Sequence, residues 1–137
     1  MTAACERLGI GLLAYGALAG GFLSERWLGQ PAPGEPLENR SLVKYRLIIE
    51  EFGGWASYQQ LLRALDAVAR KHRTTIGAVA VRWVMDQPGV AGVIVGARHA
   101  RHLPQTVAAT TLVMDEEDRD RIARAQGRAA STAAPAL

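Results

Sequence analysis

Two short turns carry the residues whose types and spacing could do chemistry, and each turn follows an apolar run. The first spans residues 15–21 (YGALAGG) and contains Gly16, Gly20 and Gly21. Glycines at such a turn let the backbone approach a ligand closely, and the exposed amides can hold phosphate oxygens. A tight connection from a strand into a helix would use the same glycines, so both interpretations stay open for this turn on its own.

The second turn spans residues 95–98 (VGAR) and contains Gly96 and Arg98. This turn would bring together free amides at a strand end, the dipole at the start of a helix and the guanidinium group of an arginine. Such a combination suits the binding of an anion. A solvent-exposed arginine on an ordinary turn is the equally simple alternative. Phosphate sites recur after the last two strands of (β/α)8 barrels, so a pair of such turns favours a phosphate site in both.

The elements that position these turns follow from the apolar pattern. Residues 10–15 and 90–95 are unbroken apolar runs, typical of strands that are covered on both faces in a parallel sheet. Thr75 can cap a helix, and Pro104 either bends a helix or shifts its start. Helical spacing of apolar residues predicts helices over residues 2–8, 42–52, 61–72, 76–84 and 98–109, and from residue 115 onward.

Strands that alternate with helices imply βαβ units, so the sequence predicts the α/β class with two parallel strands and several helices. A two-stranded sheet has two open edges, and this chain alone could not cover both faces of its apolar strands. We therefore expect an incomplete barrel unless the chain oligomerises. One domain is predicted over residues 1–128, followed by a disordered small-residue tail over 129–137.

Composition excludes several classes of function. The net charge of +3 is spread along the chain without a basic block, which argues against nucleic-acid binding. Cys5 is the single cysteine, so no intrachain disulfide and no cysteine-rich metal site are expected. The chain shows no signal-peptide pattern and no apolar run near ~20 residues, so we expect a cytoplasmic protein with no membrane partner.

The combined motifs resemble the aldo-keto reductase family. Residues 5–24 (CERLGIGLLAYGALAGGFLS) are similar to the family's seventh barrel strand and its loop, and residues 93–98 (VIVGAR) are similar to its eighth-strand signature. Residues 71–72 and 76–90 resemble the helical region before the eighth strand. The likeness covers about residues 3–125 in family order. It implies the C-terminal βα units of a (β/α)8 TIM barrel.

The resemblance also implies an NADP(H) site and a small-molecule ligand. Tyr15 matches the aromatic residue that stacks on the nicotinamide ring, and Gly96 and Arg98 match the turn that holds the adenosine 2′-phosphate. The usual Glu-Asn pair at the adenine end is replaced by Gln-Thr at residues 105–106. The other matching positions lie along the pyrophosphate, just beyond it and near the adenine: Gly16, Leu18, Gly20, Ser24, Arg26, His102 and Gln105.

The residues that perform the family's chemistry have no counterpart here. In the family a Tyr protonates the substrate carbonyl, a Lys and an Asp tune it, and a His lies nearby. All four come from earlier strands, in a stretch that would precede Met1. The remaining tyrosines, lysines and histidines form no set of nucleophile, base and orienting group. We therefore predict no catalytic residue, no metal ligand and no carbonyl reduction by this chain alone.

Three hypotheses remain. The chain could be a truncated reductase that works with a separately encoded partner supplying the other strands. It could be a repurposed fragment that self-associates through its strand edges and binds a small molecule or catalyses a non-redox step such as cyclisation or dehydration. The gene could also start upstream, with Met1 as an internal methionine of an ordinary reductase.

Arg98 provides the first test. Arg98→Ala should weaken NADPH binding by about 1.5–3 kcal/mol, because it removes a charge-assisted contact to the 2′-phosphate. NADH lacks that phosphate, so its affinity should hardly change. Fluorescence titration of both nucleotides measures the difference, and equal weakening of both would contradict the assignment of Arg98.

Overall fold

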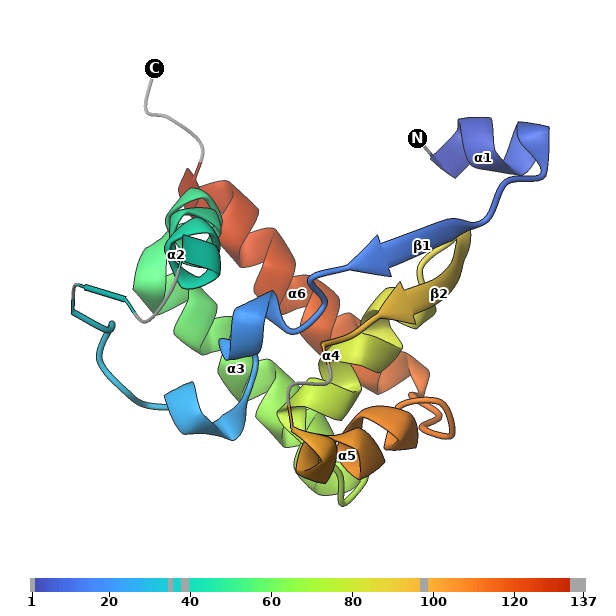
Figure 1. Cartoon of the computed structure of the whole chain (residues 1–137). Helices are drawn as coiled ribbons and strands as arrows, with labels where there is room; N and C mark the ends of the chain where they lie inside the picture. Colours follow the sequence, from blue (N-terminus) through green and yellow to red (C-terminus); the bar gives the residue numbers. More distant parts are fainter. Residues whose placement is uncertain (1, 35, 38–39, 97–98, 134–137) are drawn as a thin grey trace.

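The structure is a computed structural model that describes residues 2–34, 36–37, 40–96 and 99–133. Figure 1 shows strands β1 and β2 side by side on one flank, helices α3, α4 and α6 forming the body, and α1 projecting beyond the amino end of β1. In chain order the elements, with short 3-10 helices as η, are α1 (Thr2–Leu8), β1 (Leu12–Tyr15), η1 (Ala19–Gly21), η2 (Glu25–Trp27), α2 (Arg40–Glu51), α3 (Gly54–Lys71), α4 (Ile76–Met85), β2 (Val90–Ile94), η3 (Ala100–His102), α5 (Leu103–Ala108) and α6 (Glu116–Ala133).

The two strands form a parallel pair, as the sequence predicts. Leu12 lies opposite Val90 and Tyr15 opposite Ile94, with an irregularity in register after Leu12. Burial alternates along β1, and Leu13 keeps 65% of its surface exposed. The apolar runs predicted full cover, but one face of this sheet is open, because in this chain the helices lie against the other face.

The hydrophobic core lies between α3, α4 and α6. Leu62 of α3, Ile76 of α4 and Ile122 of α6 are fully buried and belong to one cluster. Phe22, from the connection between η1 and η2, completes that cluster, and its carbonyl accepts a hydrogen bond from the Tyr58 hydroxyl. This bond fastens the segment after β1 to α3, so the core holds the first turn in place.

Local signals set the helix boundaries near the site. The Thr75 hydroxyl oxygen accepts a hydrogen bond from the Ala78 amide at 3.2 Å, which confirms the predicted cap of α4. The predicted helix over 98–109 is instead η3 followed by α5. Pro104 lies in the first turn of α5, where its missing amide costs no hydrogen bond.

The end of the chain differs from the predicted boundary. Helix α6 continues to Ala133, beyond residue 128, and residues 134–137 of the predicted tail lie outside the described residues. No helix in the described part of the chain is long and apolar enough to cross a membrane.

A charged cluster joins the end of α3 to the start of α6. Lys71 Nζ donates to Asp118 Oδ1 at 2.9 Å, and His72 Nε2 lies 2.6 Å from Asp118 Oδ2. Because a carboxylate only accepts, the His72 ring is the donor. Burial alone would raise the pKa of the Asp118 carboxyl, but the hydrogen bonds from His72 and Lys71 outweigh it and lower this pKa to about 2.

Asp118→Asn should lower the free energy of unfolding at pH 7 by about 1–3 kcal/mol, since it removes the buried carboxylate that accepts hydrogen bonds from Lys71 and His72. The depressed pKa means that this contribution is present above pH ~4 and is lost as the pH falls towards 2. Denaturant unfolding at several pH values measures it.

Asp115→Asn is the matched control, because the Asp115 side chain is 55% exposed and its ion pair with Lys71 is screened by water. We expect it to cost less. A difference between wild type and Asp118→Asn that persisted unchanged at pH 2 would contradict the role given to the ionised carboxylate.

Candidate functional site

A cavity of about 860 Å3 lies at the carboxyl ends of β1 and β2. The turn after β1 forms one wall, and Ile94, Val95 and Gly96 at the end of β2 form another. The lining is completed by residues of η2, α2, η3 and α5 and of the first turn of α4. Parallel pairing puts both carboxyl ends at the same edge of the sheet, which is why two turns far apart in sequence face one space.

The structure brings together most of the residues singled out from the sequence. Those that line this cavity come from both turns and from the segments beyond them: Gly16, Leu18, Gly20, Ser24, Arg26, Gly96, His102 and Gln105. Two others differ. Arg98 lies outside the described residues, and Tyr15 is not part of this lining.

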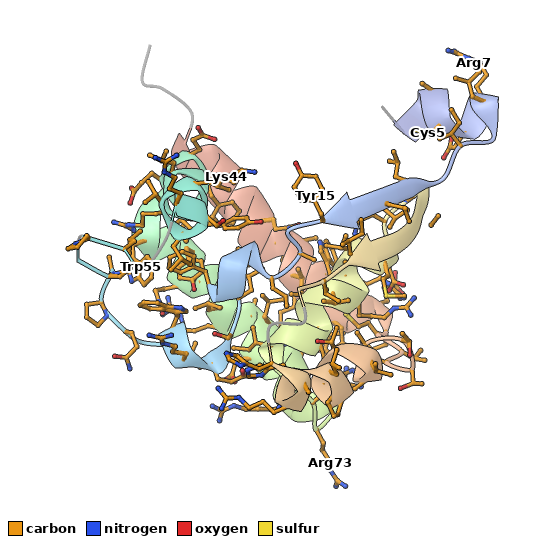
Figure 2. All side chains as sticks on the ribbon, in the orientation of Figure 1. Cys5, Arg7, Tyr15, Lys44, Trp55 and Arg73 are labelled. Atoms are coloured by element: carbon orange, nitrogen blue, oxygen red, sulfur yellow. The ribbon has the colours of Figure 1, made fainter. Side chains whose placement is uncertain are left out.

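Tyr15 lines a separate hollow of about 260 Å3, next to Trp83 of α4 and Gln126 of α6. The residue is 74% exposed, and Lys44 Nζ lies 5.6 Å from the centroid of its ring. Figure 2 shows Tyr15 at the carboxyl end of β1 with Lys44 of α2 on the same side. In this chain the Tyr15 ring therefore contacts a cation and stands apart from the larger cavity.

Tyr45 of α2 covers the glycine turn, which the sequence did not predict. Gly16 and Gly20 have φ values of 78° and 64°, in the left-handed region that favours glycine. A Cβ atom at Gly16 would lie 2.7 Å from the Tyr45 hydroxyl, and one at Gly20 would lie 2.7 Å from the Tyr45 ring. Both interpretations of the glycine turn, as a tight connection and as part of a ligand site, therefore fit these two glycines. They permit the close turn and they also border the cavity.

Glu25 fixes η2 against the start of α4. The Ile76 amide donates to Glu25 Oε1 at 2.6 Å, so this carboxylate satisfies one of the free amides at the helix start. The Ser24 hydroxyl donates to the Gly21 carbonyl at 2.8 Å, and Arg26 lies 5.2 Å from the centroid of the Trp27 ring. The bond of Glu25 with the Ile76 amide therefore joins the segment that carries Ser24 and Arg26 to α4.

Cationic and titratable side chains gather at the wall that η3 forms. His99, Arg101 and His102 line the cavity there and are exposed. The two imidazole centroids are 5.9 Å apart, and Arg101 Nε donates to His102 Nε2 at 3.3 Å. Arg26 and Arg101 give the described lining two cationic side chains against the single carboxylate of Glu25, which favours an anionic ligand.

The described residues offer little for bond-making chemistry. They include no group of three His, Cys, Asp or Glu side chains that could hold a metal ion. The one carboxylate in the described lining is Glu25, and it is bound to the Ile76 amide. Amides, cations and a hollow are features of a binding site for a phosphorylated molecule.

The family model described as "Aldo/keto reductase family" matches residues 1–126, nearly the whole chain. The chain belongs to the aldo/keto reductase family. The resemblance found in the two turns is thereby confirmed, and the parallel strands with surrounding helices are consistent with part of the family's barrel.

Three curated relatives illustrate the match within this family. Flagellar radial spoke protein 5 of Chlamydomonas reinhardtii is 35% identical over 86 residues, 60% of this chain and 16% of its own length. "Uncharacterized oxidoreductase YrpG" of Bacillus subtilis is 29% identical, over 83% of this chain and 31% of its own. "Probable aldo-keto reductase 1" of Glycine max is 26% identical, with the same two shares. The chain thus spans less than a third of the length of these relatives.

The contact between Gly16 and Tyr45 predicts a measurable coupling. Gly16→Ala should destabilise the chain by about 1–3 kcal/mol for the left-handed backbone, with a further cost from the 2.7 Å approach to the Tyr45 hydroxyl. Tyr45→Phe in the Gly16→Ala background should recover part of the loss, since the ring carbons nearest to that Cβ are 3.5 Å away. Thermal unfolding of the double-mutant cycle gives the coupling energy.

Gly21→Ala is the control, because Gly21 has a φ of 97° and a Cβ added there would meet no atom within 4 Å. This variant should incur only the backbone cost, and Tyr45→Phe should not rescue it. Equal rescue of both alanine variants would contradict the contact.

Proposed function

We propose that this chain is the NADP(H)-binding portion of an aldo-keto reductase. The observation that carries the proposal is that the turn after β1 and the turn after β2 line one cavity with a cationic wall. Family membership supplies the reaction class, because relatives carry names of oxidoreductases.

In this proposal different residues of the cavity contact different parts of the cofactor. The backbone of the Gly16–Gly20 turn lies against the pyrophosphate, and Ser24 and Arg26 of the adjoining segment contact its far side. Gly96 lies against the 2′-phosphate, and His102 and Gln105 flank the adenine. The fit rests on amides, cations and a volume of about 860 Å3, a size typical of sites for small molecules and cofactors. Bound NADPH would supply the hydride for carbonyl reduction.

The preference for NADP(H) over NAD(H) follows from charge. A 2′-phosphate adds close to two negative charges, and the described lining offers Arg26 and Arg101 against the single carboxylate of Glu25. Arg98, which the resemblance assigns to the same phosphate, would add a further guanidinium group.

The carbonyl-reducing residues would come from outside this sequence. The open face of the sheet exposes Leu13, Tyr15 and Ile94, each by more than half of its surface, and each strand has an unpaired edge. A partner chain or an upstream segment that carries the missing strands would cover these groups. The Tyr, Lys, Asp and His that the family uses would then reach the nicotinamide end of the cavity. We also propose a cytoplasmic location.

Self-association is the second candidate, and the same exposed apolar face favours it. Copies of this chain could bury Leu13 and Ile94 against one another, and the cavity could then serve a non-redox reaction such as cyclisation or dehydration. Light scattering measures the mass of the isolated chain and so separates the two candidates. A monomer that becomes active only when the complementing segment is added would exclude self-association.

The isolated chain should bind NADPH without oxidising it when aldehydes or ketones are added. Adding a separately produced segment with the family's remaining strands should restore NADPH consumption. Arg26→Gln should weaken NADPH binding several-fold, since it removes a cation from the lining. Titration calorimetry and NADPH absorbance are the measurements.

Arg73→Gln is the matched control. Figure 2 shows Arg73 projecting away from the body of the molecule, and this residue is not part of the cavity lining. It should leave the affinity for NADPH unchanged. Failure of the wild-type chain to bind NADPH, or equal weakening by both variants, would contradict the proposed site.

A further inference from the structure

Helix α2 has an outer face that stays exposed in the part of the chain that the structure describes. Its inner face, with Leu42, Tyr45 and Ile49, packs into the hydrophobic core and lies against α3 and η1. On the opposite side, Val43 and Leu47 keep 44% and 59% of their surface exposed. Apolar residues on both sides of a helix are typical of a helix that packs on both sides.

The charges on this outer face are ordered along the helix. One stripe of the face consists of residues spaced by four, three and four positions: Arg40, Lys44, Leu47 and Glu51. Such spacing places side chains above one another on a helix, and all four are exposed. The stripe therefore carries cations towards the amino end of α2, an apolar residue beyond them and a carboxylate at the carboxyl end.

The two ends of the stripe have no ionic partner within the described chain. The ion pair on α2 joins Arg46 to Glu50 at 2.9 Å, and neither Arg40 nor Glu51 forms one with another described residue. These two side chains cannot meet each other, because the helix between them is ~16 Å long at 1.5 Å per residue.

This order of charges is the opposite of the one that stabilises a helix by itself. The helix dipole favours anions near the amino end and cations near the carboxyl end. The first turn of α2 has no acidic residue and its last turn has no basic residue. The positions of Arg40 and Glu51 are therefore not explained by the stability of α2, and they point to a partner that binds both charges.

A second copy of α2 in the antiparallel direction has the complementary order. A twofold axis across the middle of the helix sets Arg40 of each copy opposite Glu51 of the other, so that two ion pairs form at once. In the same register Val43 of each copy lies opposite Ile48 of the other, and the pairing covers both of these exposed side chains. The two helix dipoles are then antiparallel, which also favours the pair.

We propose that the outer face of α2 binds the same face of a second copy of this chain in an antiparallel pair. The stripe residues are not among those that line the cavity, so this inference goes beyond the proposed function and does not depend on NADP(H). It also differs from association through Leu13 and Ile94 of the sheet. One helix pair buries less than the ~1,200 Å2 of a standard interface, so we expect a weak and reversible dimer.

Sedimentation velocity of the full chain, over a wide range of concentration and at low and high salt, tests the proposal. The wild type should shift from monomer to dimer as its concentration rises, and added salt should weaken the dimer because it screens the ion pairs. Arg40→Glu and Glu51→Lys should each weaken it about tenfold, since each change sets like charges against each other at both ends of the pair.

The two charge-reversed variants also test the antiparallel register. Mixed in equal amounts, they should associate with each other as the wild type does, because each reversed charge then meets the opposite sign. The double variant Arg40→Glu/Glu51→Lys should dimerise for the same reason. Both changes place the sign that the helix dipole favours, so thermal unfolding of the monomer should show no loss of stability.

Arg73→Glu is the matched control, because it makes the same change of charge at a residue that projects away from the body of the molecule (Figure 2). This variant should dimerise like the wild type.

Three results would overturn the proposal. The first is a wild-type chain that stays monomeric at every concentration. The second is association that survives both reversals and is lost in Leu13→Gln, which would place the interface on the sheet. The third is that the reversals weaken binding of the complementing segment of the barrel and leave self-association unchanged, which would assign the α2 face to that segment. The proposed function is judged separately, by the NADPH titration.

Discussion

Parallel pairing of β1 with β2 is the constraint on which the rest of this structure depends. The two strands are separated by three α-helices and two 3-10 helices in sequence, and their parallel pairing brings the turn after each strand to the same edge. Neither turn forms the cavity alone, because the glycine turn lines one side and the segment after β2, which includes Arg101, lines the other. One backbone ladder of a few residues thus assembles the cavity.

The helices of the body hold the segments that flank the paired strands in place. Helices α3, α4 and α6 supply the buried core, and two of them are tied to segments near the site. Tyr58 of α3 holds the segment after the glycine turn, and Glu25 bonds the start of α4. Because these anchors are hydrogen bonds with little exposure to water, they fix the loop more firmly than exposed ion pairs would.

Local pattern was enough to predict the strands, the order of the helices and the Thr75 cap, since apolar period and capping chemistry act over a few residues. Most of the residues that it singled out do line the cavity, because each turn is marked by a glycine after an apolar run. Tyr45 on the glycine turn, Glu25 on the start of α4, and the bonds of His72 with Asp118 depend on contacts between distant segments. No local pattern encodes such contacts, so these side chains could not be placed from the sequence.

The unpaired edges of the sheet have a consequence for handling the isolated chain. Residues 12–15 (LLAY) and 90–94 (VAGVI) contain no proline and no charged side chain, the features that normally prevent strand edges from joining. Free backbone amides and carbonyls flanked by exposed Leu13 and Ile94 are therefore a template for aggregation. The two short strands are therefore the segments through which copies of the isolated chain should aggregate, and aggregation should increase steeply with protein concentration.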